Sequence, residues 1–208
     1  MKRLLLSLAL ILAAPLAFAG GSTAGNGGDV SVWADNNTFF YGDIEAKGGA
    51  ISGNGGFVET SGKVYLDALG NVDASAANGK GGEWLLDPND ITITNLPDSN
   101  NQVTGNPNFT STNNNGRIGV SSIQANLNAG TSVMVTTGTA GGNSQNGDIT
   151  VAASIGKSAG GDASLTLSAH NNIVLNNNVT IGSSVGKLNV SLLSNNDSAN
   201  GGSITLSG

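Results

Sequence analysis

Apolar and polar residues alternate in short runs along most of the chain, and glycine, asparagine or aspartate closes almost every run. Residues 30–32 (Val-Ser-Val) and 91–93 (Ile-Thr-Ile) show the period of two that is typical of a half-buried β-strand. In the first half, runs of this kind lie at 29–34, 38–46, 56–60, 63–69, 83–86 and 90–94. The pattern predicts an all-β fold of short strands joined by tight turns.

Similar apolar runs recur through the second half at nearly regular steps. They start at residues 133, 149, 165, 188 and 204, so the successive steps are 16, 16, 23 and 16 residues. Residues 147–151 (Gly-Asp-Ile-Thr-Val) and 202–206 (Gly-Ser-Ile-Thr-Leu) are alike, which a β-sandwich does not explain. A period of roughly 20 residues with two or three short strands per unit predicts a parallel β-helix, in which inward Val, Ile and Leu stack from rung to rung.

Two segments depart from this pattern. Residues 121–127 have apolar residues at helical spacing, and we expect a helical turn there with Ser122 as its cap. Residues 95–119 are rich in Asn, Ser, Thr and Pro, and we expect a long loop or insertion that projects from the body. The remaining segments, 20–94 and 120–208, are then the rungs, and the last rung is uncapped.

The N-terminus has the layout of a secretory signal peptide over residues 1–19. A basic pair at 2–3 precedes an apolar run at 4–16, and residues 17–19 (Ala-Phe-Ala) fit the small-x-small cleavage pattern. The apolar run is too short for a good membrane span. We therefore expect cleavage after Ala19, a mature chain without a membrane span, and a protein secreted to the extracellular space or the outer cell surface.

Composition argues against a nucleic-acid partner and against stabilisation by disulfides. Charged residues make up 11% of the 208 residues, the formal net charge is −6, and cysteine is absent. An average globular domain has about 25% charged residues. Because no basic stripe is available to neutralise phosphates, we expect no nucleic-acid partner. Without disulfides, an exported chain must gain its stability from burial and backbone pairing.

Motifs for catalysis and metal binding are weak. His170 is the only histidine, and a lone histidine at a turn is more often solvated or capping than catalytic. Residues 182–186 (Gly-Ser-Ser-Val-Gly) match a serine-nucleophile pattern but lack its strand–elbow–helix setting. The acidic turn 87–90 lacks the central Gly and terminal Glu of an EF-hand, and no His/Cys cluster suits zinc. We expect no catalytic residue, cofactor or metal site.

A carbohydrate-active β-helix enzyme is an alternative from another class. It would need two carboxylates facing each other at about 5–9 Å, with a basic partner. The candidate carboxylates are Asp43, Glu45, Glu59, Asp67, Asp87 and Asp90, and the candidate bases are Lys47, Lys63 and Lys80. A simpler interpretation is that residues 87–90 form a turn whose aspartates accept backbone N–H bonds, while Glu45 and Glu59 point outward from strands.

Aromatic residues concentrate in the first half of the chain. We expect three of them to be inward rung residues: Trp33, Phe57 and Trp84. Outward aromatic rings can stack on sugars or on receptor side chains. On this basis the candidate surface contacts are Phe39, Tyr41, Asp43 and Glu45.

Four segments between Gly27 and Thr94 resemble a known family. They are 28–35 (Gly-Asp-Val-Ser-Val-Trp-Ala-Asp), 40–44 (Phe-Tyr-Gly-Asp-Ile), 55–63 (Gly-Gly-Phe-Val-Glu-Thr-Ser-Gly-Lys) and 85–93 (Leu-Leu-Asp-Pro-Asn-Asp-Ile-Thr-Ile). They resemble the repeat region of filamentous-haemagglutinin-like exoproteins, the bacterial adhesins of two-partner secretion that include the high-molecular-weight adhesins. The resemblance implies a right-handed parallel β-helix and a role in adhesion. The family's secretion domain is not evident, because scaffold-type repeats begin within ten residues of the expected cleavage site.

These features predict a non-enzymatic, secreted, adhesin-like β-solenoid. Its repetitive polar surface would attach to host glycans, matrix or other cells, so the expected partners are host or cell-surface glycans or proteins. An uncovered last rung would also allow end-to-end self-association, because its N–H and C=O groups are unpaired. The second hypothesis is therefore a self-assembling extracellular filament or matrix subunit, and the third is the carbohydrate-active enzyme.

Overall fold

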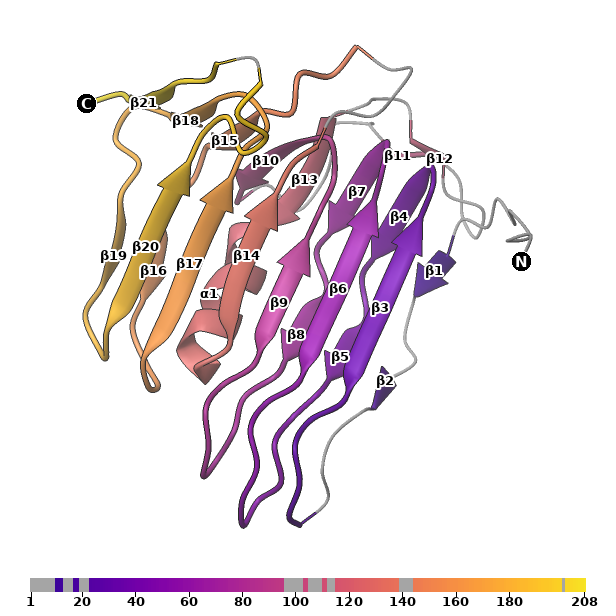
Figure 1. Ribbon diagram of the computed structural model, residues 1–208, viewed down its shortest axis with the longest axis vertical. Coiled ribbons are helices and arrows are strands. Elements are labelled where there is room, and N and C mark those ends of the chain that lie inside the picture. Colours follow the sequence, from indigo (N-terminus) through magenta and orange to yellow (C-terminus); the bar gives the residue numbers. More distant parts are fainter. Residues whose placement is uncertain are drawn as a thin grey trace.

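The chain winds around one axis in successive turns of short strands (Figure 1). The computed structural model describes residues 10–12, 17–18, 23–95, 103–104, 110–111, 115–138, 144–199 and 201–208. Among the described strand pairs, one is antiparallel, between β11 (Val103–Thr104) and β12 (Thr110–Ser111). The pairs that join one turn to the next are parallel, so the predicted parallel β-helix is confirmed.

Two sheets make up most of the solenoid wall. The face at the front of Figure 1, called the front sheet below, consists of β3 (Asp29–Ala34), β6 (Phe57–Gly62), β9 (Glu83–Leu86), β14 (Ser132–Thr136), β17 (Ala163–Ser168) and β20 (Leu188–Leu193). The second sheet, called the back sheet, runs in the order β1 (Leu10–Leu12), β4 (Asn37–Phe40), β7 (Tyr65–Ala68), β13 (Asn115–Gly119), β10 (Asp90–Thr94), β15 (Ile149–Val151), β18 (Ile173–Leu175) and β21 (Ile204–Leu206).

A third face closes each turn with shorter elements. It contains β2 (Ala17–Phe18), β5 (Asp43–Glu45), β8 (Asn71–Asp73), the helix α1 (Val120–Ala129), β16 (Ile155–Lys157) and β19 (Ile181–Ser183). The helix contacts both β8 and β16, so it occupies the position that a strand takes in the other turns. The predicted cleavage site after Ala19 lies outside the described residues.

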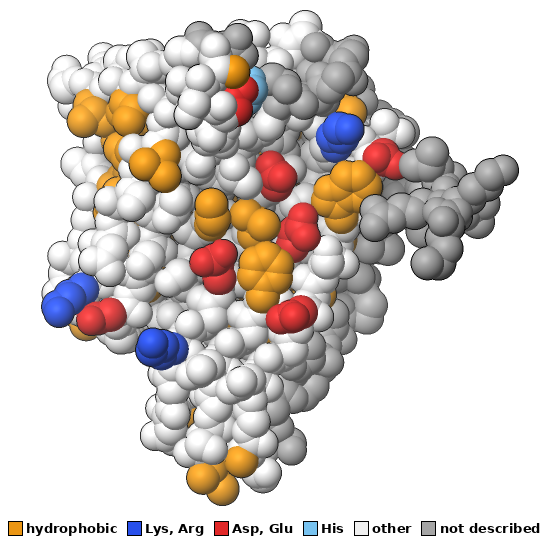
Figure 2. Space-filling model, viewed as in Figure 1, with side chains coloured by type: hydrophobic (Ala, Val, Ile, Leu, Met, Phe, Trp, Pro, Cys, Tyr) orange, Lys and Arg blue, Asp and Glu red, His pale blue; other side chains and the backbone are white. Residues whose placement is uncertain are grey.

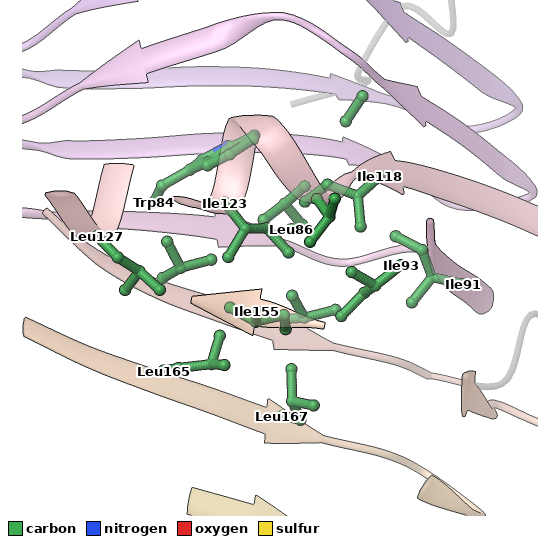
Figure 3. Packing of buried hydrophobic residues seen from close by; sticks show 14 of the residues in the cluster. Trp84, Leu86, Ile91, Ile93, Ile118, Ile123, Leu127, Ile155, Leu165 and Leu167 are labelled. Atoms are coloured by element: carbon green, nitrogen blue, oxygen red, sulfur yellow. The ribbon is translucent and has the colours of Figure 1, made fainter. Parts of the chain in front are cut away.

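Inward side chains stack in columns from one turn to the next. Val58, Trp84, Val133 and Leu165 form one column of the front sheet, and all four are buried. The only polar atom of the Trp84 side chain is satisfied, because Nε1 donates a hydrogen bond of 2.9 Å to Thr60 Oγ1. Figure 3 shows aliphatic side chains of the other faces meeting these columns in one continuous core. The prediction that Trp84 is a core residue is confirmed.

The helical turn expected at residues 121–127 is part of a longer helix, α1, whose cap differs from the expected one. Gly119 takes the N-cap position without a side-chain hydrogen bond, and Ser122 lies inside the helix. Ile123 and Leu127 point into the core and are buried. The helix ends at Gly130, whose φ of 86° lies in the left-handed region that glycine adopts without strain.

The segment expected to be an insertion ends with a core strand. Strand β13 follows β10 in sequence but lies between β7 and β10 in the back sheet. Ile118 pairs in register with Ala68 on one side and Ile93 on the other, and its side chain is buried. The expectation that residues 95–119 project from the body is therefore wrong for residues 115–119, and most of the rest lies outside the described residues.

Candidate functional site

Outward side chains on the first four strands of the front sheet form the candidate site. Its apolar members are Trp33, Phe57, Leu85 and Met134, and its acidic members are Asp29, Glu59, Glu83 and Asp87. We call this set the acidic–apolar face. Figure 2 looks onto the front sheet and shows hydrophobic and acidic side chains intermixed near its middle, with Lys and Arg side chains toward the margins.

Alternation along the strands aims these side chains outward. On β3, Val30 and Val32 pack against the core, so Trp33 faces solvent and is 52% exposed. On β6, Val58 is buried and its neighbour Phe57 points out. The expectation that Trp33 and Phe57 are core residues is therefore wrong, because each is out of phase with the inward valines of its strand.

Strand register places acidic and apolar side chains side by side across the sheet. One row consists of Asp29, Phe57 and Glu83. The adjacent row consists of Ser31, Glu59, Leu85 and Met134. Each carboxylate in these rows stands opposite an apolar or hydroxyl side chain. The nearest acidic residues are diagonal neighbours, whose positions on a sheet are about 7–8 Å apart, and this spacing reduces but does not remove the repulsion between them.

The negative charge of the acidic–apolar face is not neutralised within the described part of the chain. None of its four carboxylates forms an ion pair with another described residue. Glu59 Oε2 accepts a hydrogen bond of 3.0 Å from Ser31 Oγ. Burial, together with the negative charge of Glu59, raises the pKa of the Asp87 carboxyl above its ordinary value. The face therefore favours a positively charged group over an anion.

A shallow hollow continues the face at the start of the strands. It has a volume of about 440 Å³ and is lined by Asp29, Phe57 and Glu83, together with the glycines that directly precede β3, β6 and β9. Close approach of neighbouring turns requires these glycines: a Cβ on Gly56 would lie 2.1 Å from the carbonyl oxygen of Gly28. The hollow is lined by both acidic and aromatic side chains, as the face is.

Two of the four expected surface contacts lie on the outer side of the back sheet. Phe39 is 0% exposed, and its ring centroid lies 5.8 Å from that of Tyr65 and 6.5 Å from that of Tyr41. Tyr41 is half-buried and donates a hydrogen bond of 2.8 Å to Asp67 Oδ2. The expectation of a surface contact at Phe39 is wrong, because the outer side of the back sheet is covered at this position.

The other two lie on β5, in the third face. Asp43 is exposed, and its Oδ1 accepts a hydrogen bond of 3.2 Å from Asn71 Nδ2. Glu45 is half-buried and lies 3.6 Å from Lys47 Nζ, which also pairs with Asp73 at 2.9 Å. Both side chains are therefore in another face than Trp33, and a ligand role for Asp43 and Glu45 stays a prediction.

Asp67 belongs to a buried ion pair. Its two carboxylate oxygens accept hydrogen bonds of 2.7 and 2.8 Å from Nε and Nη2 of Arg117. The hydroxyl of Tyr41 donates to the same carboxylate, and burial and the negative charge of Asp67 raise the pKa of Tyr41 above its ordinary value. With all its oxygens engaged and no exposure, Asp67 holds the outer side of the back sheet together.

The side chain of Asp90, in residues 87–90, accepts backbone N–H bonds, as predicted. Its Oδ1 accepts hydrogen bonds from the backbone N–H groups of Gly147 (2.7 Å) and Asp148 (2.8 Å). Burial raises the pKa of Asp90, although these N–H groups act in the opposite direction. Asp90, the first residue of β10, thus joins two rungs through its side chain.

The histidine and the serine motif that the sequence singled out both contact other residues of the fold. His170 is buried, and its Nδ1 lies 3.4 Å from Asp197 Oδ2. The central serine of residues 182–186 is Ser184, whose Oγ lies 3.5 Å from the carbonyl oxygen of Lys157. In the part of the chain that the structure describes, no group of three or more His, Cys, Asp or Glu side chains could hold a metal ion.

Lys157 is a buried cation that the sequence pattern does not reveal. Its side chain is 1% exposed, and Nζ donates to the carbonyl oxygens of Ala159 (2.6 Å), Gly160 (3.3 Å) and Val185 (2.6 Å). These carbonyls belong to the loops that follow β16 and β19. Lys157 therefore ties two successive rungs together at one corner of the solenoid.

Comparison with known proteins does not assign the chain to a family. No protein-family model matches its sequence, and no match was found among the curated proteins. The helix of the described residues is also too short to span a membrane. Functional inference therefore depends on the chemistry of the faces.

Proposed function

We propose that this protein is an exported, non-enzymatic β-solenoid that attaches to glycan, matrix or cell surfaces through its acidic–apolar face. The observation that carries this proposal is that the exposed Trp33 lies on the same outward side of the front sheet as Phe57, Leu85 and Met134. Aromatic side chains and methionine are enriched where proteins contact partners, and several apolar side chains gathered on one outward face indicate an interaction surface better than a single exposed residue does.

The sheet gives the face its binding geometry. Neighbouring strands of a sheet are about 4.8 Å apart, and outward side chains along one strand are about 6.6 Å apart. Trp33, Glu59 and Leu85 are therefore held on a stiff lattice, because their backbones are paired on β3, β6 and β9. A preformed lattice loses little conformational entropy when it binds. This supports attachment through the front face, with the long polar surface of the other turns acting as a scaffold.

The environment of the carboxylates favours binding over hydrolysis. A glycosidase needs one carboxyl group as acid and a second one about 5–9 Å away as base or nucleophile. Asp67 and Asp90 are held by hydrogen bonds within the fold. Glu59 and Asp87 lie on an open sheet rather than in a cleft that encloses a sugar. This arrangement supports a non-enzymatic role.

Attachment assays on the purified chain test this proposal. Wild type is compared with Trp33→Ala/Leu85→Ala on immobilised glycans, matrix proteins and whole cells. We expect attachment to at least one class of surface and at least a tenfold loss in the double variant. The matched control is Ile51→Ala/Val185→Ala, since these side chains are 70% and 46% exposed outside the face. Equal loss in both variants, or no attachment by wild type, would contradict the proposal.

A second candidate function, assembly along the axis, is supported by the exposed apolar side chains of β21. Ile204 and Leu206 pair in register with Ile173 and Leu175 of the back sheet, and they are 42% and 65% exposed. A second copy stacked on β20 and β21 would bury them. Light scattering over a range of concentrations tests this: growth that Leu206→Ser abolishes would support assembly, and a constant monomer mass would contradict it.

A further inference from the structure

We propose that the acidic–apolar face binds an extended, positively charged polypeptide segment with the pattern basic–x–apolar–x–basic. This inference rests on the proposed function and adds the chemical class of the partner. Three observations carry it: the uncompensated carboxylates, the apolar side chains between them, and the order in which β9 presents both.

Strand β9 and the residue after it present outward side chains in the order acid, apolar, acid. Glu83, Leu85 and Asp87 alternate with the buried Trp84 and Leu86, so all three face outward. Their spacing is about 6.6 Å, the distance between outward side chains of any extended strand. A second extended chain lying along β9 therefore has its own alternate side chains in register with these three positions.

The negative charge of the face favours a segment with basic side chains. A lysine or arginine opposite Glu83 and another opposite Asp87 would neutralise carboxylates that have no ion-pair partner among the described residues. Glu59 lies on β6 directly beside Leu85 and diagonally from both acids, so it adds to the potential at each basic side chain. An anionic glycan would be repelled from this face, and a neutral glycan would leave its charge uncompensated.

The apolar members complete the site. Met134 stands next to Leu85 in the same row, so the two form a patch for the central apolar side chain of the segment. Phe57 pairs with Glu83, and its ring lies where it can cover the alkyl stem of the first basic residue. Trp33 is exposed, and its indole can accept a cation over its face.

A direct test titrates the chain with the synthetic peptide Gly-Lys-Thr-Leu-Thr-Lys-Gly, blocked at both ends, and follows binding by calorimetry and tryptophan emission. We expect saturable binding that weakens as salt rises, because exposed ion pairs are screened. The peptide with both lysines replaced by glutamate should not bind. A peptide with the two lysines adjacent should bind several-fold more weakly, since only one of them can then reach an acid.

Charge variants locate the site. Glu83→Gln/Asp87→Asn should weaken peptide binding about tenfold, because each exposed ion pair contributes roughly a two- to fivefold factor. The control Asp162→Asn/Asp197→Asn removes the same charge from exposed positions outside the face and should leave binding unchanged. Thermal melting of all variants checks that they remain folded. Equal weakening by both double variants, or tighter binding to a neutral glycan oligomer than to the peptide, would overturn the inference.

The two proposals fail in different ways. If the chain attaches to surfaces and loses attachment in Trp33→Ala/Leu85→Ala, yet the lysine peptide does not bind, the partner class is wrong and the proposed function stands. If the peptide binds and depends on Glu83 and Asp87, but no surface is bound, the inference holds as a peptide site and the proposed function is wrong.

Discussion

Breaking the buried ion pair between Asp67 and Arg117 should destabilise the solenoid strongly. The Asp67 side chain has no exposure, that of Arg117 is 7% exposed, and their shortest contact is 2.7 Å. Replacing Arg117 by methionine keeps most of the side-chain volume but leaves a buried carboxylate without its cation. Removal of one partner from a buried pair costs about 3–5 kcal/mol. We therefore expect Arg117→Met to lower the free energy of unfolding by about 4 kcal/mol.

Urea unfolding monitored by the emission of the buried Trp84 measures this effect. With a slope of about 2 kcal/mol per M, a loss of about 4 kcal/mol moves the midpoint down by about 2 M. The double variant Asp67→Leu/Arg117→Met removes both charges together. It should recover most of the loss, apart from about 1 kcal/mol for the hydrogen bond that Tyr41 donates to Asp67.

The control for this experiment is Lys63→Met, which removes an exposed cation from the turn after β6. It should change the free energy of unfolding by less than about 0.5 kcal/mol. A loss below about 1 kcal/mol in Arg117→Met would refute the reasoning. So would a double variant that is as unstable as Arg117→Met, because the deficit would then come from packing rather than from the unpaired charge.

Three further predictions concern single positions. Lys157→Met removes the donor that joins part-buried carbonyl oxygens of two loops and should lower the free energy of unfolding by about 1–3 kcal/mol in urea titrations. Trp84→Ala should cost about 3–5 kcal/mol, whereas Trp33→Ala should change stability by less than about 0.5 kcal/mol; similar losses would contradict the assigned burial. The pKa of Asp87 is raised in the folded state, so protonated Asp87 contributes stability that is fully present below its ordinary pKa of about 3.9 and is lost as pH rises through the folded value. Melting curves should therefore show Asp87→Asn more stable than wild type at pH 7 and no more stable near pH 3; an equal difference at both pH values would contradict this.

The fold follows from local patterns that the sequence displays. Alternation at residues 30–32 and 91–93 corresponds to inward positions of β3 and β10. The steps of 16 residues in the second half instead lead from one sheet to the other, because β14 and β17 belong to the front sheet and β15 to the back sheet. A rung is therefore longer than the predicted period of roughly 20 residues, since Leu165 stacks on Val133. The alternation is visible in the sequence because every rung buries one side of each strand against the same core. The helical spacing at residues 121–127 predicts α1 for the same reason, since a helix also needs one apolar side.

The position of β13 could not be inferred from the sequence. This strand follows β10 along the chain but inserts before it in the back sheet, so sequence order does not give its neighbours. The ion pair of Arg117 with Asp67, 50 residues apart, depends on that insertion. The hydrogen bonds from Lys157 Nζ to backbone carbonyls likewise require the stacking of two loops, which only the folded chain brings together.

The outward direction of Trp33 and Phe57 could have been predicted from their positions along the strands, although their aromatic character led to the expectation that they are buried. Trp33 follows Val32 directly, so it must face the opposite side of β3 from the inward valines. Phe57 stands in the same relation to Val58 on β6. Trp84 differs because it is in phase with Leu86 and stacks on Val58. Phase along the strand, rather than residue type, decides which aromatic side chains are exposed in this solenoid.

The most direct test of the proposed attachment is hydroxyl-radical footprinting of the chain, free and bound to a surface that it recognises. We predict that oxidation of Trp33, Phe57, Leu85 and Met134 falls on binding, while Ile51 and Val185 react at unchanged rates. Protection confined to other positions, such as Ile204 and Leu206, or unchanged oxidation of Trp33 in the bound state, would contradict it.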